Sequence, residues 1–174
     1  LVAEVLSVDP RAAASHDSAA HLWGLITSEP QEFHVVVRRW RREIRTTARV
    51  HESLDFVPKD RVWKDGIPIT TPTRTIVDLG ATSKWLVEAA LSRGLRSGIL
   101  DIAEIEAFVR RVARRGRRGV GVIRPLLEFH SVSEGTTESP LEDMFMRLIH
   151  DSGLPAPVPQ FIVREPSGVP VSRA

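Results

Sequence analysis

The stretch from Gly66 to Gly80, GIPITTPTRTIVDLG, constrains the fold more than any other part of the sequence. Ile67, Ile69 and Thr71 alternate with their neighbours in the manner of a β-strand. Thr71 followed by Pro72 then predicts the start of a helix. A threonine hydroxyl caps free amide groups, and proline at the first helical position costs no hydrogen bond. The chain therefore changes from strand to helix at this point.

The helix that begins at Pro72 is predicted to end near Gly80. Three apolar residues follow its start and form a stripe: Ile76, Val77 and Leu79. Arg74 and Asp78 are four residues apart, so they lie on one helical face and can pair, which stabilises an exposed helix by a few tenths of a kcal/mol. The stretch contains no nucleophile with a base, no phosphate loop and no metal cluster. We interpret Thr71, Pro72, Arg74 and Asp78 as the structural corner of an α/β core.

The patterns on either side of this corner predict an α/β (α+β) fold, with a small mixed or antiparallel sheet followed by a helical segment. The expected strands are 33–37, 48–51, 61–64 and 67–70, and Asp65-Gly66 predicts a tight hairpin turn between the last two. The expected helices are 1–6, one capped by Ser15, 84–96, one that begins at Asp101, and one that ends near Phe129. Trp23 and Trp85 are expected in the core.

A polar segment from Ser131 to Thr137 predicts a domain boundary. We expect an α/β regulatory domain at 1–130, a linker at 131–137, and the incomplete start of a second domain at 138–174. In the last segment, Ser139-Pro140-Leu141-Glu142 is a helix-capping box, and a short strand pair is expected near the C-terminus. One helix and part of a hairpin bury too little apolar surface to form a core.

Charge is distributed unevenly, although the net charge of the 174 residues is only +2. Arginine greatly outnumbers lysine and occurs in two clusters. The first comprises Arg38, Arg39, Arg41, Arg42, Arg45 and Arg49, with Trp40 among them, and the second comprises Arg110, Arg111, Arg114, Arg115, Arg117, Arg118 and Arg124. Guanidinium groups match phosphate oxygens, and an aromatic ring among them suits unpaired bases. The clusters predict a nucleic-acid-binding surface; the alternative is a coding preference for arginine on ordinary solvated faces.

Several classes of site are disfavoured by composition. The chain has no cysteine, which excludes disulfides and thiolate metal sites and fits a cytoplasmic protein. No apolar run approaches the roughly 20 residues that span a membrane. The histidines are scattered along the chain, and His16 and His21 are five apart rather than the four that share a helical face. We therefore predict no metal site in this chain and no membrane partner.

The order of motifs resembles a class of bacterial proteins. The sequence contains, in this order, SAAHLWGL, FHVVV, a basic run, ARVHES, GIPITTPTRTIVDLG, RRGRRG and TESPLEDMFMRLI. This order resembles that of AbiEi-like antitoxins of type IV toxin–antitoxin systems. In the proteins it resembles, the antitoxin is fused to a Vsr-like, restriction-endonuclease-like C-terminal domain. The resemblance covers roughly Arg11 to Ala174. It implies an antitoxin-like, nucleic-acid-associated regulatory fragment without catalytic activity of its own, with DNA and a nucleotidyltransferase-like toxin as partners. The winged helix of that family would precede Leu1.

The same resemblance implies two alternatives. In the first, the chain is part of an Mg²⁺-dependent Vsr-like DNA endonuclease, and Glu142 is the acid on the first helix of its active site. The next expected acid would fall beyond Ala174, so this chain is expected to need no cofactor and to be inactive as a nuclease. Glu142 is equally explained by its place in the capping box. In the second alternative, the chain is a protein-interaction module that binds a toxin.

Overall fold

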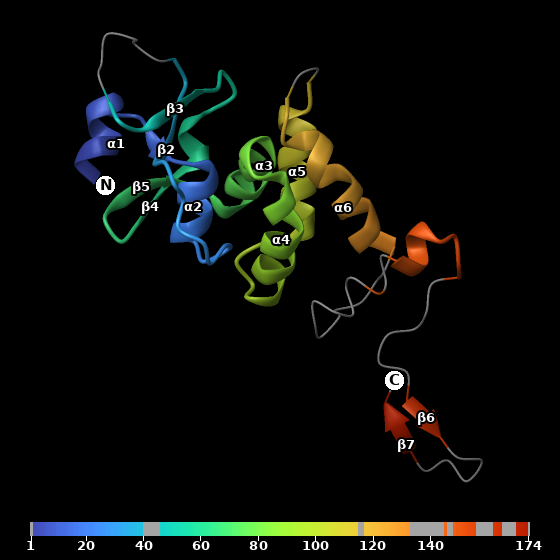
Figure 1. Cartoon of the computed structure of the whole chain (residues 1–174). Coiled ribbons are helices and arrows are strands. Elements are labelled where there is room, and N and C mark those ends of the chain that lie inside the picture. The colour runs from blue at the N-terminus through green and yellow to red at the C-terminus, as the bar shows by residue number, and fades with distance from the viewer. Residues whose placement is uncertain are drawn as a thin grey trace. The chain divides into compact units, whose positions relative to one another are not determined.

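The computed structural model describes residues 2–39, 46–114, 117–132, 145, 148–155, 162–164 and 170–173 (Figure 1). The chain divides into two compact units, residues 1–127 and residues 128–174.

The first unit contains a five-stranded sheet with the strand order β3-β2-β1-β5-β4. The strands are β1 (Ala13–Ala14), β2 (His34–Val37), β3 (Arg49–Glu52), β4 (Arg61–Lys64) and β5 (Ile67–Thr70). β1 is antiparallel to β2 and parallel to β5, and β2 is parallel to β3. The sheet is therefore mixed, and the predicted α+β class is confirmed.

The hairpin between β4 and β5 follows the prediction from Asp65-Gly66. The two strands are antiparallel, with Lys64 opposite Ile67. Asp65 and Gly66 both have positive φ angles, of 50° and 76°. This is the backbone that a two-residue turn between twisted strands requires, and aspartate and glycine tolerate it best.

Helices surround the sheet and form a second core beside it (Figure 1). They are α1 (Val2–Val8), α2 (His16–Leu22), α3 (Pro72–Thr82), α4 (Val87–Arg96), α5 (Ile102–Val112) and α6 (Val120–Val132), with short 3₁₀ turns η1 (Pro58–Asp60) and η2 (Lys84–Leu86). Val5 of α1 packs with Val35 and Val37 on one face of the sheet. The larger core lies among α3, α4, α5 and α6 and includes Ile105 and Ile123.

Two predicted helix starts are confirmed by their capping bonds. The Thr71 hydroxyl accepts a hydrogen bond from the Arg74 amide at 3.3 Å, and the Asp101 carboxylate accepts one from the Glu104 amide at 2.9 Å. Ser15 precedes α2 as predicted, but its hydroxyl forms no capping bond.

The predicted end of α3 at Gly80 is wrong, because the helix continues to Thr82. Gly80 lies where the backbone of a second segment approaches the helix. A Cβ atom built at Gly80 would lie 3.1 Å from the Cα and carbonyl oxygen of Gly119. The glycine therefore permits close packing between α3 and the start of α6 rather than ending a helix.

The prediction that Trp85 belongs to the core is also wrong, since 71% of the residue is exposed. Trp85 lies in η2, a single turn with no buried residue. Trp23 is partly buried against both cores, and its indole N–H donates to the Thr70 carbonyl at 2.9 Å.

In the second unit, residues 148–151 are helical and Gly153 follows with a φ of 68°. β6 (Ile162–Arg164) and β7 (Pro170–Arg173) are antiparallel, which confirms the strand pair expected near the C-terminus. Glu142 and positions 133–137 of the expected linker lie outside the described residues. Across the described part of the chain, no helix has both the length and the apolarity needed to cross a membrane.

Gly119 provides a test of the contact between α3 and the start of α6. A Cβ atom at this position would lie 1.7 Å from the Val77 carbonyl oxygen, a backbone atom that cannot turn aside. Gly119→Ala should therefore lower the free energy of unfolding by about 1–3 kcal/mol or more. Urea titration monitored by tryptophan fluorescence measures this, since all four tryptophans belong to the first unit.

Gly121→Ala is the matched control, because a Cβ atom there would meet nothing within 4 Å. Gly121 lies inside α6, where alanine is favoured over glycine by up to about 1 kcal/mol, so this variant should be as stable as the parent or more stable. Equal stabilities of the two variants would contradict the packing described.

Candidate functional site

Arg74, in the first turn of α3, is completely buried. Its Nε donates to Asp78 at 3.0 Å, its Nη1 donates to Asp60 at 3.1 Å, and its Nη2 donates to Ser53 Oγ at 2.9 Å. Nη2 also donates to Asp55 Oδ1 at 3.3 Å. The predicted pairing of Arg74 with Asp78 is thus confirmed, as one bond of a buried network rather than as an exposed pair.

Two phenylalanine rings complete the surroundings of the guanidinium group. The central carbon of the Arg74 guanidinium, Cζ, lies 5.1 Å from the centre of the Phe56 ring and 5.9 Å from the centre of the Phe108 ring. Both distances are within the range of cation–π attraction. Burial alone would lower the pKa of Arg74, but the carboxylates of Asp78, Asp55 and Asp60 outweigh it and raise the pKa. The group therefore carries a permanent, buried positive charge.

Three arginines of the second cluster extend this network. Arg111 pairs with Asp60, Arg117 pairs with Asp78, and Arg114 Nη2 lies 3.5 Å from Asp55 Oδ2. Together with Arg74, four guanidinium groups thus face the carboxylates of Asp55, Asp60 and Asp78. The network joins the segment after β3, the η1 turn, α3 and the segment from α5 to α6.

Asp55 shows the electrostatic balance of this network. Burial favours its neutral form, but the hydrogen bond from Ser53 and the positive charges of Arg117 and Arg74 hold the pKa of the carboxyl below its ordinary value. A carboxylate held in this way acts as a counter-charge and is a weak proton acceptor. Asp55 therefore stabilises the arginines and is poorly suited to act as a base.

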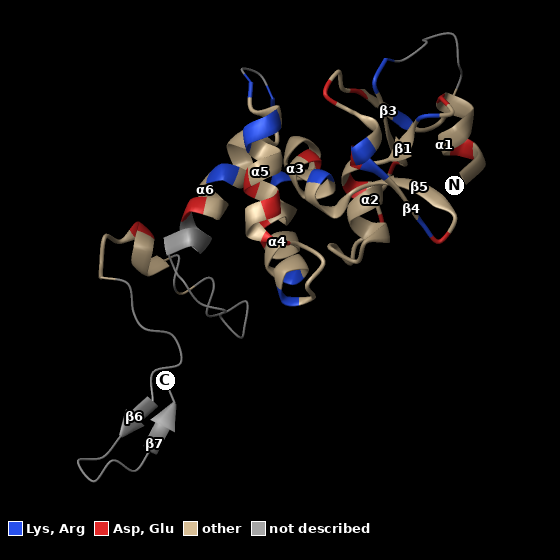
Figure 2. Ribbon diagram, turned by 180° about the vertical axis from the view of Figure 1, so that it is seen from behind, with Lys and Arg blue, Asp and Glu red and all other residues tan. Residues whose placement is uncertain are grey.

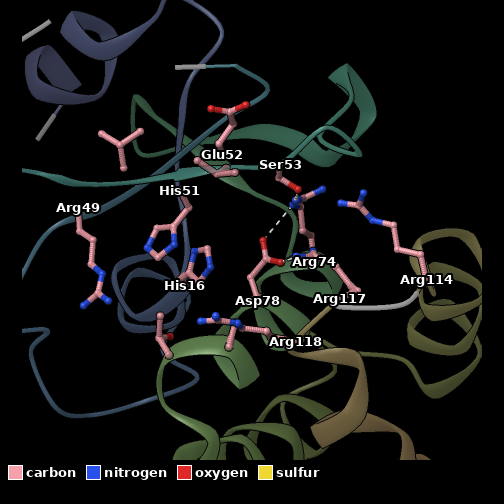
Figure 3. A pocket seen from close by; sticks show the side chains of 14 residues that line it. His16, Arg49, His51, Glu52, Ser53, Arg74, Asp78, Arg114, Arg117 and Arg118 are labelled. Atoms are coloured by element: carbon pink, nitrogen blue, oxygen red, sulfur yellow. Dashed lines mark hydrogen bonds and ion pairs between the residues drawn. The ribbon is translucent and has the colours of Figure 1, made fainter. Parts of the chain in front are cut away.

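An open pocket of about 460 Å³ lies against the network, and we call it the histidine pocket (Figure 3). Its charged and imidazole side chains are His16, Arg49, His51, Glu52, Arg74, Asp78, Arg114, Arg117 and Arg118. Figure 3 shows His16 and His51 side by side, on the opposite side of Asp78 from Arg114. Five arginines against two acids make the lining basic.

Three histidines meet in one cluster at this pocket. Ring nitrogens of His16, His34 and His51 all lie within 4.8 Å of one another. His51 Nε2 is 3.2 Å from His34 Nδ1, and the His16 and His51 rings are stacked with their centres 3.6 Å apart. The cluster was missed in the sequence analysis, which compared the histidines by their spacing along the chain.

Strand register and one unusual backbone angle bring the histidines together. In the parallel pair of β2 and β3, His34 lies opposite Arg49 and Val36 lies opposite His51. Side chains alternate between the two faces of a sheet, so His34 and His51 share one face. His16 follows β1 and has a φ of 50°, a left-handed conformation that is uncommon outside glycine. This register could not be read from the sequence.

The cluster is uncharged at neutral pH. The pKa values of His16 and His51 are lowered to about 3, first by burial and then by neighbouring positive or titratable groups, His34 among them. Burial also lowers the pKa of His34, although the nearby Asp17 carboxylate opposes this. Asp17 Oδ2 lies 3.7 Å from His34 Nδ1 and accepts a hydrogen bond from Thr82.

The residues predicted to bind nucleic acid are divided among different places. Figure 2 shows basic segments at the end of α5 and beside β3. Arg118 is exposed at the histidine pocket, and Arg110 is exposed and pairs with Glu106. Arg38 and Arg39 line a second pocket of about 650 Å³ with Arg11 and Arg61. Five of these residues lie outside the described part of the chain: Trp40, Arg41, Arg42, Arg45 and Arg115.

These features define an α+β domain with a buried arginine network and a basic pocket. Residues 12–129 match the family of the AbiEi antitoxin C-terminal domain. This match covers more than half of the 174 residues, so the chain belongs to that family. Comparison with curated proteins finds no match. The matched segment contains the network and all three histidines, and the Vsr-like resemblance of 138–174 lies outside it and stays a prediction.

Lowered histidine pKa values predict a loss of stability in acid. An unfolded histidine has a pKa near 6.5, whereas His16 and His51 take up protons only near pH 3 in the folded state. Between these values the unfolded chain binds more protons. The free energy of unfolding should therefore fall as the pH drops below 6.5 and continue to fall toward pH 3.

His51→Gln should make this fall less steep, by up to about 1.4 kcal/mol per pH unit, because one proton no longer binds preferentially to the unfolded chain. Urea titrations at several pH values measure the slope. His150→Gln, an exposed histidine outside the cluster, controls for removal of a histidine. A slope in His51→Gln equal to that of the parent would contradict the described burial of the cluster.

Proposed function

We propose that the chain is the regulatory domain of an antitoxin and that it associates with nucleic acid by binding backbone phosphates at the histidine pocket. The observation that carries this proposal is the basic lining of the pocket, which contains five arginines and two acids. The domain performs no catalytic step of its own. A toxin–antitoxin role follows from the family, and the nucleic-acid partner is the part proposed here.

The arginines of the pocket have two separate roles in this proposal. Arg74 and Arg117 are buried or nearly so, and their charges are compensated by Asp78 and Asp55. The exposed arginines at the pocket are Arg49, which pairs with Glu32, Arg114, which lies at the margin of the network beside Asp55, and Arg118. Exposed guanidinium groups next to the rigid, buried network can form paired hydrogen bonds with phosphate oxygens.

The second pocket extends the basic surface along one edge of the sheet. β2 and β3 are parallel, and Val37 lies opposite Glu52 at their carboxyl ends. Arg38 and Ser53 are the next residues of the two strands, so the segments that line the two pockets leave the sheet at the same edge. We infer that phosphates of one nucleic acid backbone contact both sets of arginines.

The absence of catalysis is supported by how the acids are used. Asp55, Asp60 and Asp78 each contact at least two arginines of the network. A carboxylate that acts as a base or as an Mg²⁺ ligand needs free oxygen lone pairs directed at the substrate or ion. Carboxylates surrounded by guanidinium groups serve instead to hold those groups in place.

A toxin is the second candidate partner, and the observation that favours it is Trp63. Trp63 lies on the edge strand β4, is 59% exposed, and has the guanidinium of Arg61 5.0 Å from its ring. Exposed tryptophan and arginine side chains are enriched where proteins bind one another. In this alternative, a nucleotidyltransferase-like toxin binds at β4. The proposal that 138–174 begins an Mg²⁺-dependent endonuclease domain is independent of both.

The nucleic-acid proposal predicts the behaviour of two single variants. Arg118→Ala and Arg49→Ala should each weaken binding of a labelled duplex about three- to tenfold, equally for unrelated sequences, because one phosphate contact is lost. The slope of log affinity against log salt should become shallower by about 0.9 in each variant. Fluorescence anisotropy at a series of salt concentrations measures both quantities.

Lys84→Ala is the matched control, since it removes one exposed positive charge that does not line either pocket. It should leave affinity and salt slope close to those of the parent. Equal weakening by all three variants would show that binding depends on the overall charge of the protein and not on this pocket. A parent chain that binds no duplex at low salt would contradict the proposal and favour the toxin as partner.

A further inference from the structure

We propose that His16, His34 and His51 form a binding site for a transition-metal ion of the Zn²⁺ type, with an open coordination position that faces the histidine pocket. The site involves no acid of the arginine network. It is independent of nucleic-acid binding and is tested separately.

Two of the three rings already have the separation that a shared ion imposes. Two imidazole nitrogens bound to one tetrahedral Zn²⁺ lie about 3.3–3.4 Å apart, and the ring centres lie about 5 Å apart. His51 Nε2 and His34 Nδ1 are 3.2 Å apart, and the centres of these two rings are 5.0 Å apart. An ion can therefore replace the hydrogen bond between the two nitrogens with little movement of either ring.

His16 supplies the third nitrogen. Its Nδ1 is 2.9 Å from the Ser15 hydroxyl, which leaves Nε2 as the nitrogen for an ion. A hydrogen bond to the other ring nitrogen is the usual way in which proteins orient a metal-binding histidine. The ring is stacked on His51 at 3.6 Å, closer than two rings on one ion, so binding requires the His16 side chain to turn.

The backbone of His16 is a second, independent observation. His16 is buried and adopts a φ of 50°, a conformation that costs free energy in a residue other than glycine. The carbonyl of the preceding Ser15 nevertheless accepts the first bond of α2, from the Ala19 amide. The strained angle directs the imidazole toward the cluster, and strain of this kind concentrates at functional sites.

Charge around the cluster also permits a cation. Asp17 lies 3.7 Å from His34 Nδ1, and its carboxylate accepts hydrogen bonds from Thr82 and Ser83. The nearby positive charges of Arg74 and Arg117 are compensated by Asp78.

The open position follows from which residues line the pocket. His16 and His51 line it, whereas His34 is not among its lining residues. Three histidines with a fourth position left to water or another ligand is an arrangement that zinc adopts in proteins.

The experiment measures metal binding on the tag-free chain, freed of metal and then titrated with ZnCl₂ by calorimetry and with CoCl₂ by visible absorption. The parent should bind one Zn²⁺ per chain and give Co²⁺ absorption bands of a low-symmetry site. His51→Ala should weaken Zn²⁺ binding by at least about 100-fold, and Ser15→Ala, which keeps all three rings, by about 10-fold. His150→Ala is the matched control and should bind as the parent does.

Nitrogen-15 NMR of the histidine rings gives a second reading that needs no variant. On addition of one equivalent of Zn²⁺, the ring nitrogens of His16, His34 and His51 should shift and those of His150 should not. Failure of the parent to bind Zn²⁺ would overturn the proposal, as would ring shifts confined to other histidines. Equal Zn²⁺ affinity of His51→Ala and His150→Ala would do the same and would leave the cluster as a hydrogen-bonded stack.

Discussion

The buried positive charge of Arg74 has to be balanced by negative charges inside the protein. Several segments of the first unit supply these charges. A fully buried guanidinium group without partners would cost several kcal/mol. Asp55, Asp60 and Asp78 supply that balance from three separate segments of the chain. These segments converge on the first turn of α3, where Thr71 and Pro72 fix the start of the helix. The sheet, α3 and the segment from α5 to α6 are thus joined at one point.

The basic pocket follows from the same balance. Three carboxylates face four guanidinium groups, and Arg118 adds an exposed positive charge nearby. The acids are surrounded by arginines, so the surface that remains for a ligand is positive. The neutral side chains of His16 and His51 line the same pocket, and His34 contacts His51. One wall of the pocket is therefore charged and the other offers neutral nitrogen atoms.

Features that depend on neighbouring residues, such as helix caps and tight turns, could be predicted from the sequence. Thr71, Asp101 and Asp65-Gly66 each act within a few positions of themselves, and their caps and turn were found where expected. Gly80 was misread because its role depends on Gly119, which is distant in sequence. Trp85 was misread because hydrophobicity alone does not say whether a residue in a short turn faces the core.

The candidate site was predicted only in part. The arginines of the second cluster and the pairing of Arg74 with Asp78 were visible as composition and spacing. Their burial, and the partners Asp55 and Asp60, depend on tertiary contacts that no local pattern records. The histidine cluster depends on the parallel register of β2 and β3 and on the backbone of His16. Neither could be derived from residue spacing.

The most direct test of this account is a double-mutant cycle between Arg74 and Asp78, measured as free energies of unfolding in urea. Arg74→Met and Asp78→Leu should each destabilise the protein by about 3–5 kcal/mol, because each removes one member of a buried charge network and leaves its charges unbalanced. The double variant should be less destabilised than the sum of the two by at least about 1–2 kcal/mol, since the two groups compensate each other. Additive losses, or losses under about 1 kcal/mol as expected of an exposed pair, would show that Arg74 does not hold this domain together.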